Sequence, residues 1–246
     1  MKDDAQIPVE NEPSVVNKIN FVREELIIAF GEPEWRQPLP PVDELVSTIL
    51  SQNTNDVNRD AAFGQLKKEF PNWQAVIDAP ESAVVDSIRI AGLAKQKGPR
   101  IQQALRDILE FTEGEISLDF LKTKQVDQAR DWLTNLNGVG PKTAAIVLLF
   151  SLGMPAFPVD THIYRVTGRI GLRPQDINVE KAHQYLEERI PEEYYYDLHL
   201  NLIKLGREIC GARKWYCYRC PIESFCEFQE KNLDIPDKKL GTELKV

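Results

Sequence analysis

Residues 136–150, LNGVGPKTAAIVLLF, constrain the fold more than any other stretch of this chain. The segment 137–141 holds two glycines and a proline. These residues favour a tight turn, because glycine adopts positive φ and proline suits the first position of a helix. The residues that follow are almost all hydrophobic, which predicts a helix buried on most sides. The pattern therefore predicts a hairpin between two helices, with the second helix in the core.

Hydrophobic residues recur at helical spacing along most of the remaining chain, and alternating runs typical of strands are scarce. We therefore expect an all-α fold of short helices joined by short turns. The expected helices are 14–30, 42–51, 56–69, 73–79, 81–90, 97–112, 118–121, 126–136, 142–152, 161–170, 179–190 and 194–209.

The N-terminal residues MKDDAQIPVENEP are acidic and polar and do not have the pattern of a signal peptide. No apolar run approaches the length of a membrane span. We expect a soluble, intracellular protein, in which four cysteines are not expected to form structural disulfides. The formal net charge of −8 argues, taken alone, against a nucleic-acid-binding protein.

The glycine turn suits an anion, since its backbone N–H groups and the start of the next helix attract negative charge. Phosphate is the obvious anion, although a simple turn without a ligand fits the same residues. Lys142 lies at the positive end of that helix, which disfavours its ammonium form. A neutral amine there is a nucleophile that can form a Schiff base. The alternative is a solvated lysine that only touches the anion.

Asp160 precedes the apolar positions of the segment VDTHIYRV and is well placed to cap a helix. A carboxylate at a helix start could also accept a proton or stabilise a developing cation. His162 follows two residues later, and a single histidine in such a place is more often structural than catalytic.

The four cysteines lie near the C-terminus in the pattern C-x6-C-x2-C-x5-C, and four thiolates this close together suit one metal centre. Zinc usually takes two separate close pairs, whereas only one such pair is present here. A [4Fe–4S] cluster is larger and suits the longer loops better. Zinc and a redox-active CxxC pair stay open as alternatives. The proposed ligands are Cys210, Cys217, Cys220 and Cys226.

Three motifs in this order, LNGVGPKTA, VDTHIYRV and the four cysteines, make the chain resemble endonuclease III, in the iron–sulfur branch of the helix-hairpin-helix DNA glycosylase superfamily. The resemblance extends from about residue 42 to residue 226. It implies a bifunctional DNA repair enzyme that removes oxidised pyrimidines and then nicks the abasic site by β-elimination. It also implies that Lys142 is the nucleophile, through a Schiff base, and that Asp160 is the essential carboxylate.

The resemblance further implies a set of DNA contacts. Gln52 in ILSQNTND would fill the gap left by a flipped base, and Leu93 in IAGLAKQK would wedge into the duplex. The other expected contacts are Gly138, Val139, Gly140, His162, Arg213 and Lys214. Two basic stretches lie beside these residues and offset the acidic total. One contains Arg89, Lys95, Lys97, Arg100 and Arg106, and the other Lys204, Arg207, Arg213, Lys214 and Arg219.

The implied architecture has two helical domains on either side of a cleft, with Lys142 and Asp160 facing each other. We expect a six-helix domain at 34–154, a cluster domain made of 14–33 and 155–229, a flexible tail at 1–13 and a C-terminal tail at 230–246. The partner is double-stranded DNA with damaged pyrimidines or abasic sites. We expect a monomer in a prokaryotic cytoplasm, associated with the nucleoid. The alternatives are a monofunctional glycosylase for another base and a non-catalytic DNA-binding module.

Overall fold

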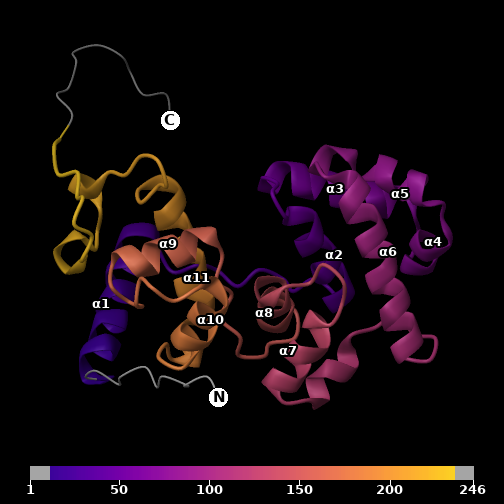
Figure 1. The fold of residues 1–246 in the computed structure, drawn as a ribbon, viewed down its shortest axis with the longest axis horizontal. Coiled ribbons are helices and arrows are strands. Elements are labelled where there is room, and N and C mark those ends of the chain that lie inside the picture. Colours follow the sequence, from indigo (N-terminus) through magenta and orange to yellow (C-terminus); the bar gives the residue numbers. More distant parts are fainter. Residues whose placement is uncertain (1–11, 236–246) are drawn as a thin grey trace, which may run out of the picture. The chain divides into compact units, whose positions relative to one another are not determined.

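A computed structural model of the chain describes residues 12–235, and it divides them between two compact units. The hairpin unit consists of Glu34–Val159 together with Pro191–Tyr196. The described part of the cysteine unit consists of residues 12–33, Asp160–Ile190 and 197–235. The described residues form helices and turns without a β-sheet, which confirms the predicted all-α class (Figure 1).

The hairpin unit is a bundle of short helices whose loops are closed by short 3₁₀ turns. Its α-helices are α2 (Pro41–Ser51), α3 (Asp56–Glu69), α4 (Trp73–Asp78), α5 (Glu81–Ser87), α6 (Ala94–Phe111), α7 (Val126–Thr134) and α8 (Pro141–Phe150). Its 3₁₀ turns are η1 (Arg89–Ala91), η2 (Asp119–Thr123) and η3 (Glu192–Tyr194).

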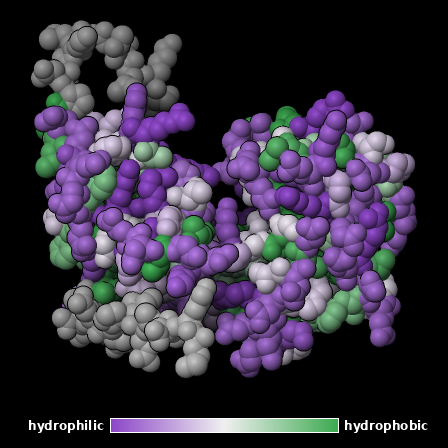
Figure 2. Space-filling model, viewed as in Figure 1, coloured by the Kyte–Doolittle hydropathy of each residue, from purple (hydrophilic) through white to green (hydrophobic). Residues whose placement is uncertain are grey.

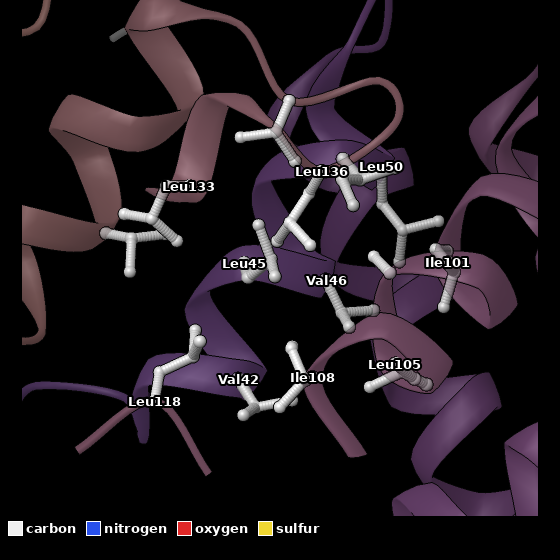
Figure 3. Close-up of a cluster of buried hydrophobic side chains, with 14 of the residues drawn as sticks. Val42, Leu45, Val46, Leu50, Ile101, Leu105, Ile108, Leu118, Leu133 and Leu136 are labelled. Carbon is white, nitrogen blue, oxygen red and sulfur yellow. The ribbon is translucent and has the colours of Figure 1, made fainter. Parts of the chain in front are cut away.

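The core of the hairpin unit lies where α2 and α8 pack together and α6 crosses beside them. Apolar side chains from α2, α6 and α7 meet there, and burying each one stabilises the fold by about 1.5–3 kcal/mol. The side chains labelled in Figure 3 are Val42, Leu45, Val46, Leu50, Ile101, Leu105, Ile108, Leu118, Leu133 and Leu136. As predicted, α8 is buried along almost its whole length from Thr143 to Phe150.

The segment Pro191–Tyr196 belongs to the hairpin unit because of its aromatic rings. The Tyr196 ring stacks on Trp35 at a centroid distance of 3.8 Å, and its hydroxyl donates to the Glu34 carbonyl at 2.8 Å. Tyr195 packs against Phe157. The sequence placed these tyrosines at the start of a helix and within the expected cluster domain at 155–229, because periodicity does not report ring contacts with distant residues.

The cysteine unit contains α1 (Glu12–Phe30), α9 (Thr161–Arg169), α10 (Val179–Glu187), most of α11 (Tyr195–Glu208) and the 3₁₀ turns η4 (Cys217–Arg219) and η5 (Glu223–Phe225). The predicted tails lie largely outside the described residues. The described part of the C-terminal tail is bonded to the cysteine loops, since Trp215 Nε1 donates to the Glu230 carbonyl and the Tyr218 amide donates to the Asn232 carbonyl.

Most helix limits agree with the predicted ranges to within three residues, and α6 shows the most informative difference. The expected start was Lys97, but α6 begins at Ala94. The amides of Gln96 and Lys97 both donate to the Leu93 carbonyl, so the first turn closes earlier than expected. Pro99 is consequently inside the helix, where it cannot donate a hydrogen bond.

Candidate functional site

The hairpin between α7 and α8 requires glycine at position 138. Gly138 has φ +83°, and a Cβ there would lie 2.7 Å from Cδ of Arg100. The Val139 amide donates to the Leu136 carbonyl at 3.1 Å, and the Val139 side chain is buried. In the part of the chain that the structure describes, the amides of Gly138 and Gly140 have no hydrogen-bond partner. Of the three hairpin residues predicted to contact DNA, the two glycines therefore keep a free donor.

Lys142 is the second residue of α8, directly after this turn. Its side chain is half-buried, and it makes no hydrogen bond or ion pair within the described residues of the hairpin unit. The amides of Lys142 and Thr143 are among the unpaired donors at the helix start. The hairpin unit thus places a primary amine without a counter-ion next to several free N–H groups.

The loop of Gln52 lies against this turn, and the loop of Leu93 lies against the loop of Gln52. Gln52, at the end of α2, donates from Nε2 to the Gly138 carbonyl at 3.0 Å. Leu93 precedes α6 in the left-handed conformation, with φ +50°, and its apolar side chain is 47% exposed. An exposed leucine held in a strained conformation is unusual, because most non-glycine residues avoid positive φ.

Lys97 does not belong to the basic surface that the sequence predicted. Its side chain is only 1% exposed, and its ammonium donates to the carbonyls of Leu50 and Ala91 and to the hydroxyl of Thr54 at 2.7–2.8 Å. Burial lowers the pKa of Lys97 to about 8. The prediction was wrong for this residue because counting basic residues along a helix ignores which side faces the core. Lys95 and Arg106 of the same stretch are exposed.

Asp160 caps α9 in the cysteine unit. Its Oδ1 accepts the amide of Ile163 at 2.8 Å, which satisfies one of the unpaired donors of the helix start. Within the described residues of that unit, the second carboxylate oxygen has no hydrogen-bond partner. One oxygen thus fixes the side chain while the other stays available.

His162 packs against α11 within the cysteine unit. The Nδ1 atom of His162 lies 3.1 Å from Nη2 of Arg165. A Cβ added at Gly206 would lie 2.9 Å from the Cβ of His162. The Arg165 guanidinium in turn donates to the carbonyls of Gly206 and Cys210. These contacts couple the start of α9 to the end of α11, where the first cysteine follows.

The four cysteines are free thiols and partly buried. Burial, together with the nearby thiols of Cys226, Cys210 and Cys217, raises the pKa of Cys220 to about 12. The thiols of Cys220 and Cys226 therefore each lie within electrostatic range of those of Cys210 and Cys217. Among residues 12–235, no three His, Cys, Asp or Glu side chains are grouped closely enough to hold a metal ion.

The loop between Cys210 and Cys217 is shaped by its own backbone. Cys210 and Trp215 form an isolated antiparallel bridge, and a Cβ at Gly211 would lie 2.3 Å from the Lys214 carbonyl oxygen. Arg213 and Lys214 are exposed at the tip of this loop. The predicted phosphate-binding side chains are consequently presented to solvent.

The comparisons with known proteins agree with one another. The model of the HhH-GPD superfamily of base excision DNA repair proteins matches residues 46–192, which is more than half of the chain. Endonuclease III of Escherichia coli is 35% identical over 78% of this chain and 85% of its own length. The chain belongs to the HhH-GPD superfamily.

Two further comparisons agree with the assignment of the chain to this superfamily. A putative DNA glycosylase of Arabidopsis thaliana is 35% identical over 70% of this chain, which spans 59% of the plant protein's length. The structure of a trapped covalent intermediate of endonuclease III with DNA has a TM-score of 0.74 at 28% identity, over 86% of this chain and 95% of that one. These findings confirm the predicted family, its class as a DNA glycosylase and lyase of base excision repair, and DNA as the partner. No helix in the described part of the chain is long and apolar enough to cross a membrane.

Sequence reasoning missed two residues of this HhH-GPD protein. Lys97 joins the loops of Gln52 and Leu93. Arg169 of α9 donates to Sγ of Cys210 at 3.3 Å and to the Gly211 carbonyl at 2.8 Å, between the rings of Trp215 and Phe228. For Lys97, the neighbouring Ile101, Ala104 and Leu105 indicated the buried face of the helix. For Arg169, no pattern in the sequence indicated a cysteine partner.

Proposed function

We propose that this protein is a bifunctional DNA glycosylase and abasic-site lyase that removes oxidised pyrimidines from double-stranded DNA. The observation that carries the proposal is the amine of Lys142, which has no partner in its own unit and follows a turn with free amide donors. Such donors suit a phosphate of the DNA backbone. A phosphate bound there would bring a deoxyribose close to the amine.

In the proposed reaction, the neutral amine of Lys142 attacks C1′ of the damaged nucleotide. The N–C1′ bond forms while the glycosidic bond breaks, and the base leaves with the electron pair of that bond and takes up a proton. Loss of the amine proton and opening of the sugar ring give an imine between Lys142 and C1′. Removal of a C2′ proton then expels the 3′ phosphate by β-elimination, which cuts the strand. Water finally hydrolyses the imine and frees the lysine.

Asp160 is proposed as the carboxylate that assists this reaction. Its anchored oxygen keeps the side chain in place, and its second oxygen could stabilise the positive charge that develops on the sugar as the base leaves. We propose further DNA contacts by the exposed side chains of Leu93, Arg213 and Lys214, by Gln52, by His162 and by the hairpin amides. Action on chromosomal DNA would place the protein with the nucleoid of a prokaryotic cell.

We propose that Cys210, Cys217, Cys220 and Cys226 hold a [4Fe–4S] cluster. The donor set fits, since the thiols are not paired in disulfides, and those of Cys220 and Cys226 each lie within electrostatic range of those of Cys210 and Cys217. Zinc sites usually use two close cysteine pairs, whereas Cys217 and Cys220 form the one such pair among these four cysteines. When bound, such a cluster would hold the loop that carries Arg213 and Lys214 in a fixed shape. With four thiolate ligands it would have no open position for a hydrolytic step.

The experiment that tests the proposal separates base release from strand cleavage. A duplex oligonucleotide with one thymine glycol is incubated with the protein, and its products are resolved with and without hot alkali. The proposal predicts cleavage without alkali on this duplex and none on the matched thymine duplex. Cleavage that needs alkali would indicate a monofunctional glycosylase. Binding without either product would indicate a DNA-binding module.

A further inference from the structure

Lys97 is buried to an extent that is rare for a lysine. At 1% exposure it is among the largest fully buried side chains of the described core, and lysines are almost never fully buried without a partner. All three donors of its ammonium are used, on the Leu50 carbonyl, the Thr54 hydroxyl and the Ala91 carbonyl. No carboxylate accepts from it in the part of the chain that the structure describes. Burying an ammonium that is held only by neutral oxygens costs free energy, which suggests that Lys97 has a role beyond packing.

The three acceptors come from two segments, the end of α2 with the turn that follows it, and η1. Leu50 and Thr54 flank Gln52 at the end of α2, and Ala91 lies two residues before Leu93. The Thr54 hydroxyl also bonds to the carbonyls of Gln52 and Ala91, so the two loops share one network. The ammonium additionally lies at the C-terminal end of α2, where a helix favours positive charge.

Both loops hold a residue in a conformation that is costly without support. Asn53 has φ +52° and Leu93 has φ +50°, and among the described residues Glu113 is the one other non-glycine residue with positive φ. Such residues persist only where the surroundings determine them, and they concentrate at ligand contacts. The network of Lys97 lies between these two residues.

We propose that Lys97 is a positioning residue that sets the spacing between the Gln52 loop and the Leu93 loop, so that both enter damaged duplex DNA in register. This inference rests on the proposed function, because it takes Gln52 and Leu93 to be the residues that enter the duplex. Lys97 itself touches neither the sugar nor the base. Its effect is therefore on duplex distortion and not on the chemistry of the imine.

The test compares two substrates. Lys97→Met keeps the length of the side chain and removes its charge and donors. On a thymine glycol duplex, the single-turnover rate should fall by about tenfold to a hundredfold, the scale of a misplaced contact. On a single-stranded oligonucleotide with an abasic site, borohydride trapping should stay within about threefold of wild type, since no duplex has to be opened there.

Gln102→Met is the matched control. Gln102 is also buried on α6, and its amide donates to the carbonyls of Val76 and Ala79, away from both loops. This variant loses buried hydrogen bonds but should keep the wild-type ratio of duplex to single-strand rates. Thr54→Val removes one arm of the network and should shift the ratio in the same direction as Lys97→Met, by less. It also keeps the test decisive if Lys97→Met does not fold.

The outcomes distinguish the inference from the proposed function. A selective loss on the duplex in Lys97→Met or Thr54→Val, absent in Gln102→Met, supports the positioning role. Equal losses on both substrates, or no loss on the duplex, overturn it and leave the lyase assignment intact. If wild type itself forms no adduct with the abasic strand, the proposed function fails and the inference falls with it.

Discussion

Replacing Gly138 by alanine tests why the hairpin has its particular sequence. Gly138 has φ +83°, and alanine pays about 1–2 kcal/mol to adopt a left-handed conformation. Its Cβ would also lie 2.7 Å from Cδ of Arg100, so the arginine must move, at a further cost of about 1 kcal/mol. We expect Gly138→Ala to lower the free energy of unfolding by about 2–3 kcal/mol in total.

The control is the second glycine of the same turn. Gly140 has φ −97°, and a Cβ there would meet nothing within 4 Å. Gly140→Ala should cost only about 0.5 kcal/mol, through a weaker helix cap. Arg100→Ala separates the two terms at position 138, because it removes the clash and leaves the backbone strain. Gly138→Ala should then cost about 1 kcal/mol less in the Arg100→Ala background than in wild type.

Urea unfolding followed by circular dichroism at constant m-value measures these differences. Equal and small effects of Gly138→Ala and Gly140→Ala would refute the claim that the turn depends on a left-handed residue at 138. A cost at 138 that does not change in the Arg100→Ala background would refute the steric part alone.

Three further predictions concern charge and capping. Asp160→Asn keeps a good helix cap and should leave the unfolding free energy within about 0.5 kcal/mol of wild type while base excision falls at least about a hundredfold, whereas Asp160→Ala should also lose about 1 kcal/mol of stability. The pKa of Lys97 is about 8, against 10.5 for an ordinary lysine, so the folded state releases this proton before the unfolded state does. Relative to Lys97→Met, the unfolding free energy of wild type should therefore rise by about 3 kcal/mol between pH 8 and pH 10.5, as measured by thermal or urea unfolding. A difference between the two proteins that does not change across this pH range would contradict the burial of a charged lysine. Arg213→Ala and Lys214→Ala should each reduce the salt dependence of duplex binding by about 0.9 in the slope of log K against log salt concentration, and an unchanged slope would show that these side chains do not contact phosphate.

The sequence predicted the helices well because most of them are amphipathic or wholly apolar. The apolar run after Pro141 has no alternative to burial, and the structure buries it as α8. The cap at Asp160 was predicted on the same local grounds, since an aspartate before a periodic apolar segment is a common helix start.

Long-range contacts between side chains could not be predicted in this way. Helical spacing could indicate that Lys97 lies on the buried face of its helix, but not that the carbonyls of Leu50 and Ala91 accept from its ammonium. Tyr196 contacts Glu34, which is 162 residues away in the chain. Arg169 reaches Cys210 across 41 residues. A single sequence carries periodicity and local turn signals, and none of these reports which distant atoms share a hydrogen bond.

The most direct test of the central claim is borohydride trapping on a thymine glycol duplex, with the modified residue located by mass spectrometry. Wild type and Lys142→Gln are compared with Lys122→Gln, which removes an exposed lysine paired with Asp119 in the same unit. We predict a covalent adduct on Lys142 in wild type, the same yield in Lys122→Gln, and none in Lys142→Gln. An adduct on another lysine, or base release by wild type without any adduct, would contradict the assignment of Lys142 as the nucleophile.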